Sequence, residues 1–304
     1  SSAAYSTKLN HSSAEETFIR IVSPEELRIC DPACGSGHML VYAFDLLHHI
    51  YTEEGYDPRE ITNLILTKNL YGIEIDQRAG TLAAFALCMK AREYGRQFLE
   101  EPTQPNICVM EDVHFRTDEI NVYMDQVGED LYTQELWQGL KQFEDAENLG
   151  SLIQPVIKNP ALIRERMEQS GVFNNLLLSS TNKKLVKVLE MSEYLQQRYH
   201  VVVANPPYMG SRNMNNDLKS FATDQYPDSK KDLFAMFIER NFSLSKEMGF
   251  VGMITMQSWM FLKSFESTRN VILKVSTILS LIHLGPHAFD TIRGEVVSTA
   301  ALFL

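Results

Sequence analysis

Two short segments hold residue types that could act together on a pair of bound molecules. Residues 202–208 read Val-Val-Ala-Asn-Pro-Pro-Tyr, and residues 29–37 read Ile-Cys-Asp-Pro-Ala-Cys-Gly-Ser-Gly. Each begins as a short apolar run, typical of a buried strand, and ends in polar or turn-forming residues. The Asn205 amide, a stiff Pro206-Pro207 backbone and the Tyr208 ring suit gripping a planar group that bears an amine. The segment at 29–37 has the layout of a nucleotide-type cofactor site.

The cofactor site can be argued from acids that follow predicted strands. Gly35 and Gly37 allow a tight turn and close backbone approach, and the next helix would point its positive end at a bound anion. Asp31 can accept from an ammonium or a hydroxyl. Glu74 ends the second predicted strand, where an acid commonly binds ribose hydroxyls. Asp112 follows the third strand and could meet an adenine amino group.

Two other interpretations of these residues stay open. A dinucleotide site is disfavoured because the full Gly-x-Gly-x-x-Gly pattern is not met, since position 40 is Leu40. In the structural alternative, Asp31 caps a turn while Glu74 and Asp76 are merely solvated.

The order of apolar patterns predicts how these residues are positioned. Over the first 110 residues, strand-like runs alternate with helix-like runs. The strands are expected at 28–31, 70–76 and 106–110, and the helices at 39–51, 61–68 and 78–98. This β-α-β-α-β order predicts an α/β fold with a doubly wound, Rossmann-like parallel sheet.

The pattern breaks at Arg116–Gln197, which is polar and mostly helical, as at 161–170 and 185–197. We expect no strand there, and the stretch is too long for a single crossover, so we interpret it as a helical insertion. Sheet structure is expected to resume with strands at 200–204, 249–256, 277–284 and 296–304, and a helix at 232–246. The predicted division is 1–115 for cofactor binding, 116–197 for the insertion and 198–304 for the catalytic half.

Composition and charge restrict the class of protein. The net charge of −11 divides into −15 for residues 1–150 and +4 for residues 151–304, so the first half is a poor surface for nucleic acid. We see no apolar run of about 18–20 residues and no secretory signal, and therefore expect no membrane association. The cysteines (Cys30, Cys34, Cys88 and Cys108) lack metal-ligand spacing. They predict buried thiols in a reducing cytoplasm and no metal site.

Taken together, Asp-Pro-Ala-Cys-Gly-Ser-Gly and the later Asn-Pro-Pro-Tyr resemble the DNA adenine-N6 methyltransferases. Residues 31–47, DPACGSGHMLVYAFDLL, resemble in particular the PglX methyltransferases of BREX phage-defence systems. The resemblance covers residues 25–115 and 198–304. It implies a class I S-adenosylmethionine-dependent methyltransferase fold, with S-adenosyl-L-methionine as cofactor and double-stranded DNA as partner. Other phage-defence proteins are further expected partners.

The same resemblance implies a role for each matching residue. The residues that it assigns to cofactor binding are Asp31, Pro32, Ala33, Gly35, Gly37, Glu74, Ile75, Asp112, Val113 and Asn205. Catalysis and capture of the flipped adenine fall to Asn205, Pro206, Pro207 and Tyr208, with Phe289 as a second aromatic wall.

Two alternatives to DNA adenine methylation stay open at this point. The same chemistry could act on RNA or on a protein glutamine, since Asn-Pro-Pro-Tyr also serves there. A scaffold that senses the cofactor and binds DNA without turnover is the third hypothesis. The chain lacks an initiator Met and stops inside an apolar run, so we interpret it as an excerpt of a longer protein. The cofactor motif precedes Asn-Pro-Pro-Tyr, and we therefore expect a target-recognition domain further C-terminal.

Overall fold

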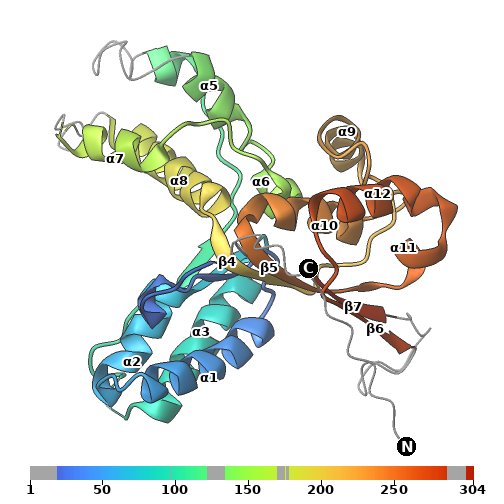
Figure 1. Cartoon of the computed structure of the whole chain (residues 1–304). Helices are drawn as coiled ribbons and strands as arrows, with labels where there is room; N and C mark the ends of the chain where they lie inside the picture. Colours follow the sequence, from blue (N-terminus) through green and yellow to red (C-terminus); the bar gives the residue numbers. More distant parts are fainter. Residues whose placement is uncertain (1–18, 97, 122–133, 170–174, 176–177, 286–298) are drawn as a thin grey trace, which may run out of the picture.

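A single mixed sheet organises the part of the chain that the computed structural model describes: residues 19–96, 98–121, 134–169, 175, 178–285 and 299–304 (Figure 1). Its strand order is β3-β2-β1-β4-β5-β7-β6. The strands are β1 (Ile29–Asp31), β2 (Leu70–Glu74), β3 (Asn106–Val109), β4 (Tyr199–Ala204), β5 (Ser245–Met256), β6 (Ser280–Gly285) and β7 (Thr299–Phe303).

Strand direction divides the sheet into two parts. The pairs β1–β2, β2–β3, β1–β4 and β4–β5 are parallel, whereas β7 runs antiparallel to both β5 and β6. The order reverses beside β1, which lies between β2 and β4 although the chain visits them in the sequence β1, β2, β4. The expected doubly wound α/β sheet is confirmed, with an antiparallel edge.

Helices cover both faces of the sheet. The α-helices of the first half are α1 (His38–Glu53), α2 (Pro58–Leu64) and α3 (Gln77–Tyr94). Between β3 and β4 lie α5 (Gln134–Lys141), α6 (Ala146–Leu149), α7 (Pro160–Gln169) and α8 (Ser179–Gln196). After β4 come α9 (Asn216–Gln225), α10 (Leu233–Leu244), α11 (Ser258–Phe261) and α12 (Glu266–Val275). Short turns are η1 (Pro24–Glu26), η2 (Ile65–Asn69, a π turn), η4 (Gly150–Leu152) and η7 (Lys263–Phe265).

The alternation of side chains along each strand builds two cores. On β4, Val202 and Ala204 enter the core shared with α8 and α10. Val201 and Val203, one residue out of phase, pack against the other core, which holds α1, α2 and α3. Successive side chains of a strand point to opposite faces, so an uninterrupted apolar strand must be covered on both sides.

The helices differ from the sequence predictions mainly at their ends. The predicted helix at 61–68 is instead α2, with Pro58 in its first turn and Asp57 accepting from Arg59 N, followed by the π turn η2. The helix predicted at 78–98 ends at Tyr94. The helix predicted at 232–246 stops at Leu244, because Ser245 already begins β5. The helices α9 and α12 were not predicted.

The stretch from 116 to 197 contains no strand among its described residues, as expected. Its helices nevertheless share a core with the sheet: Leu185 and Leu189 of α8 lie in one apolar cluster with Val202 of β4 and Phe234 of α10. The domain boundaries at 115/116 and 197/198 stay a prediction.

Candidate functional site

The strand order brings the predicted residues to one edge of the sheet. Asp31 ends β1 and Glu74 ends β2, its neighbour on one side, while Asn205 follows β4, its neighbour on the other. Asp112 follows β3, beyond β2. Because parallel strands present their carboxyl ends at the same edge, the four side chains stand there in the order 112, 74, 31, 205.

Glu74 holds the glycine turn in place. One carboxylate oxygen, Oε2, accepts a hydrogen bond from Gly35 N at 2.7 Å. The other, Oε1, accepts from the backbone N–H groups of Ile75 and Asp76, each at 3.0 Å. Glu74 is therefore not a freely solvated acid, and any cofactor hydroxyl would add to a carboxylate already fixed by three donors.

Asp31 is a buried carboxyl group with little compensation. Its side chain is 2% exposed, and Oδ1 accepts from Ala33 N at 3.1 Å. Burial, opposed by the Ala33 hydrogen bond and assisted by the nearby Glu74 charge, raises the pKa of Asp31 to about 7. A carboxyl group poised in this way is stabilised in its charged form by an adjacent cation. It suits the ammonium group of an amino-acid-type cofactor.

The glycine turn leads straight into α1. Gly35 and Gly37 have φ of +53° and +86°, a region that side-chain-bearing residues rarely adopt. A Cβ at Gly37 would lie 3.0 Å from the Ala83 Cβ of α3, whereas a Cβ at Gly35 would have no atom within 4 Å. Gly37 thus serves helix packing, and Gly35 leaves the turn open at the sheet edge. This open turn, the buried Asp31 and the Glu74 carboxylate fit S-adenosyl-L-methionine.

The Asn-Pro-Pro-Tyr loop is anchored through Asp232. Asn205 is exposed, and its side chain has no hydrogen-bond partner among the described residues. Two residues after Pro207, the backbone N of Met209 donates to Asp232 Oδ1 at 3.1 Å, and Leu233 N donates to Met209 O at 3.0 Å. Asp232 also caps α10 by accepting from Phe234 N. The start of α10 therefore fixes the loop that carries Asn205.

Tyr208 sits half-buried at the base of this loop. Its ring meets Phe234 edge-on, with ring centroids 6.0 Å apart. Its hydroxyl is buried and has no hydrogen-bond partner among the described residues. Burial and the Asp232 charge raise the pKa of Tyr208 to about 12.

The remaining predicted residues differ in their surroundings. Pro32, Val113 and Pro206 are buried, while Ile75, Asp112 and Pro207 are exposed. Val113 donates its N–H to Phe143 O at 2.9 Å and packs in the core. Phe289 lies outside the described residues.

A segment that the sequence analysis did not single out contacts the predicted cofactor residues. This bridging segment comprises residues 145–153. The Ser151 hydroxyl donates to Pro32 O, and Glu147 N donates to Asp112 Oδ1 at 2.8 Å. Gly150 lies so close to Ile75 that a Cβ there would meet Ile75 Cγ2 at 2.6 Å.

The bridging segment is also tied to the catalytic half. Arg240 of α10, only 3% exposed, donates to Ser151 O at 2.6 Å, to Ile153 O at 3.0 Å and to Leu195 O at 2.8 Å. The Tyr226 hydroxyl donates to Leu152 O at 2.6 Å. These contacts connect α10, which anchors the Asn205 loop, with Pro32 of the cofactor turn. A sequence signal for Arg240 exists: it falls on the same helix face as Phe237 and Leu244, both buried.

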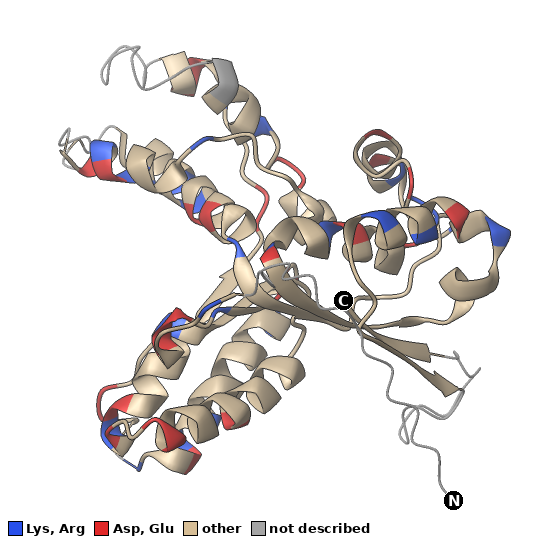
Figure 2. Ribbon diagram, in the orientation of Figure 1, with Lys and Arg blue, Asp and Glu red and all other residues tan. Residues whose placement is uncertain are grey.

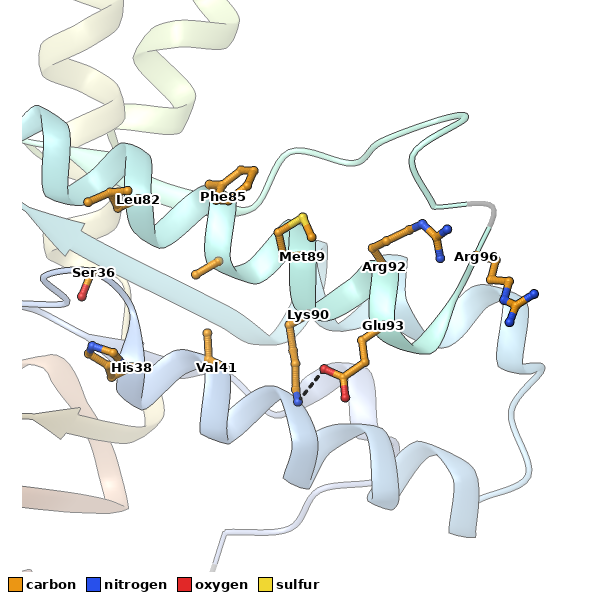
Figure 3. A pocket seen from close by; sticks show the side chains of 11 residues that line it. Ser36, His38, Val41, Leu82, Phe85, Met89, Lys90, Arg92, Glu93 and Arg96 are labelled. Carbon is orange, nitrogen blue, oxygen red and sulfur yellow. Dashed lines mark hydrogen bonds and ion pairs between the residues drawn. The ribbon is translucent and has the colours of Figure 1, made fainter.

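The groove in Figure 3 lies elsewhere, between α1 and α3. It measures about 830 Å³ and is lined by Leu82, Phe85 and Met89 of α3, with Ser36 and His38 at one end. None of the predicted site residues lines it, so we do not assign the cofactor to it.

The described residues contain no cluster of three or more His, Cys, Asp or Glu side chains that could hold a metal ion. No helix among them is long and apolar enough to cross a membrane.

The chain is similar in sequence to curated DNA modification enzymes. The chain is 40% identical to the adenine-specific methyltransferase BrxX of Escherichia coli O9:H4 (strain HS), over 92% of this chain and 25% of that protein. It is 38% identical to the adenine-specific methyltransferase PglX of Lacticaseibacillus casei (strain Zhang), over 91% of this chain and 23% of that protein. The chain thus spans about a quarter of the length of these curated relatives.

Solved structures share the fold at low identity. One is a nuclease-deletion mutant of the Type ISP restriction-modification enzyme LlaGI in complex with a DNA substrate mimic. It matches with a TM-score of 0.53 at 17% identity, over 92% of this chain and 20% of that chain. The Type IIL restriction-modification enzyme MmeI in complex with DNA matches with a TM-score of 0.50 at 14% identity, over 92% and 31%.

Two family models match the sequence. The MmeI DNA-methyltransferase domain matches residues 12–111. The Eco57I restriction-modification methylase model matches residues 68–289, which include Glu74, Asp112 and the whole Asn-Pro-Pro-Tyr loop. The chain therefore belongs to the Eco57I restriction-modification methylase family.

Proposed function

We propose that this chain is the methyl-transferring part of an adenine-specific DNA methyltransferase of a BREX or restriction-modification system. The reaction would form a bond between a methyl carbon and the N6 amine of an adenine flipped out of the duplex, while the bond from that carbon to the cofactor's sulfonium sulfur breaks. The sulfur would leave as a neutral thioether, and the methylated amine would lose one proton to water. The observation that carries the proposal is the placement of the Asn205 loop beside the Asp31 turn, on neighbouring parallel strands that pair at Cys30 and Val202.

In this proposal the residues of the loop hold the base. Flipping an adenine costs on the order of a few kcal/mol, and stacking on Tyr208 would recover about 1–3 kcal/mol. The Asn205 side-chain oxygen and the Pro206 carbonyl each accept one N6 hydrogen. This draws the amine toward a pyramidal geometry and takes its lone pair out of conjugation with the ring. Because Asp232 fixes the loop through Met209, the acceptors are positioned before the base arrives.

The residues of the other strands would hold the cofactor. When bound, S-adenosyl-L-methionine supplies the electrophilic methyl group. Asp31 would accept its ammonium group, Glu74 its ribose hydroxyls and Asp112 its adenine amino group, with Gly35 allowing close approach of the backbone.

The decisive experiment identifies the methylated product. The full-length protein is incubated with labelled S-adenosyl-L-methionine and either DNA, RNA or protein, and each product is digested to nucleosides or amino acids. We expect N6-methyl-2′-deoxyadenosine from DNA and no labelled product from RNA or protein. Label in RNA or in glutamine would move the activity to the second hypothesis, and cofactor binding without any product would support a scaffold.

A single substitution separates binding from chemistry. Asn205→Ala should leave the cofactor Kd nearly unchanged, because Asp31, Glu74 and Asp112 would make the main cofactor contacts. It should abolish methyl transfer, because the exposed Asn205 side chain would meet the substrate amine. Asp31→Ala is the matched control, since it should weaken cofactor binding. If Asn205→Ala methylates DNA at the parent rate, the proposed role of the loop is wrong.

A further inference from the structure

A small basic pocket lies next to the Asn-Pro-Pro-Tyr loop. It measures about 300 Å³, and Lys219, Lys230, Lys231, Ser211 and Thr223 are among the residues that line it. No carboxylate is among the lining residues. Three lysines therefore line one hollow whose lining residues include no acid.

Of these lysines, Lys230 is half-buried, and Lys219 and Lys231 are exposed. Lys90, Lys184 and Lys187 each form an ion pair with a carboxylate, at 2.8–3.1 Å. Lys219, Lys230 and Lys231 form no ion pair with any described residue. Figure 2 shows blue segments beside α9 and on α12, on the half of the chain with positive net charge.

The pocket is fixed relative to the base-capturing loop. Residues 209–211 run antiparallel to residues 231–233: Leu233 N donates to Met209 O at 3.0 Å, and Ser211 N donates to Lys231 O at 2.9 Å. Gly210 and Asp232 form the bridge between these hydrogen bonds. The same backbone pairing therefore holds Tyr208 and Lys231 in place. Only Met209 and Gly210 separate Tyr208 from the pocket residue Ser211.

We propose that Lys219, Lys230 and Lys231 bind backbone phosphates of the DNA strand that carries the flipped adenine. The inference rests on the proposed function, which supplies the strand. Phosphate oxygens accept from ammonium groups, and contacts of this type position a duplex without reading its sequence. Holding the backbone beside Tyr208 stabilises the strand at the point where the extruded nucleotide leaves the stack.

The test uses the full-length protein and duplex DNA, with binding measured by fluorescence anisotropy across a salt series. The slope of log K against log[salt] is negative. In the triple variant Lys219→Gln/Lys230→Gln/Lys231→Gln, it should become less steep by about 0.9 for each phosphate that the protein no longer neutralises, or by about 2.7 in total. The control variant Lys68→Gln/Arg78→Gln/Arg96→Gln removes the same charge from exposed positions of the first half and should leave the slope unchanged.

Two further readouts locate a failure. The cofactor Kd should stay the same in both triple variants, because neither set touches the cofactor turn. Equal salt slopes for the lysine variant and the control variant would overturn the proposed phosphate site. If the wild type still methylates DNA in that case, the proposed function stands. Absence of methylation by the wild type would instead refute the proposed function. Displacement of DNA by millimolar inorganic phosphate at constant ionic strength would overturn the backbone assignment in favour of a free-anion site.

Discussion

Substituting the two glycines of the turn should have two different effects. Gly37→Ala should mainly lower the stability of the fold, and Gly35→Ala should mainly lower the affinity for the cofactor. Gly37→Ala forces an alanine to φ +86°, which costs roughly 1–2 kcal/mol, and the reduced freedom of the unfolded chain offsets about 0.4–1 kcal/mol. The new Cβ would also stand 3.0 Å and 3.1 Å from Ala83 Cβ and Cα. Such overpacking adds about 1–3 kcal/mol. We expect Gly37→Ala to lose roughly 1–5 kcal/mol of unfolding free energy.

Gly35→Ala is the matched variant. Its φ is +53°, and the added Cβ meets nothing within 4 Å, so only the backbone strain remains, at about 1 kcal/mol or less. Its methyl group would project at the open side of the turn, so we expect cofactor affinity to fall at least about tenfold, equivalent to 1.4 kcal/mol. Urea unfolding gives the stability and calorimetric titration the affinity. Equal stability of the two variants would refute the role assigned to Ala83.

Three further outcomes are expected. Because the folded pKa of Asp31 is raised from 3.8 to about 7, its contribution to stability is fully present below pH 4 and is lost as the pH rises to 7. The difference in unfolding free energy between wild type and Asp31→Asn, measured from pH 4 to pH 8, should show this fall, and a flat difference would contradict the burial argument. Arg240→Met strands three carbonyls at about 1–3 kcal/mol each, so the unfolding free energy from urea titration should drop by at least about 3 kcal/mol, and a smaller loss would mean that water replaces the guanidinium. Tyr208→Phe removes a buried hydroxyl without a described partner and should leave thermal stability and base capture unchanged, whereas Tyr208→Ala should weaken base capture by about 1–3 kcal/mol in DNA-binding assays.

Sequence reasoning recovered what local patterns determine. Apolar runs such as Val201–Ala204 identified the strands, and the polar residues that follow them identified the sheet edge, because both signals lie within a few neighbouring positions. The antiparallel placement of β7 between β5 and β6 is a matter of long-range pairing. It could not be predicted from the period of the strand alone.

The bridging segment escaped prediction for a related reason. Ser151 contacts Pro32 across 119 positions, and Glu147 contacts Asp112 through its backbone N–H rather than its side chain. A backbone contact carries no residue preference that a single sequence could reveal. The turn role of Asp31 and Glu74 was only partly foreseen: both bind backbone N–H groups, but Asp31 is buried and Glu74 reaches back to Gly35.

The bridging segment also determines which chimeric enzymes can be built between relatives. A crossover at residue 115 would join the cofactor turn of one parent to the bridging segment of the other, so Pro32, Ile75 and Asp112 would meet foreign partners. A crossover inside α8 would keep these three contacts native but would pair Ser151 with a foreign Arg240. Compatibility at positions 150, 151 and 240 should therefore decide whether hybrids of this family fold, more than similarity over the surrounding helices.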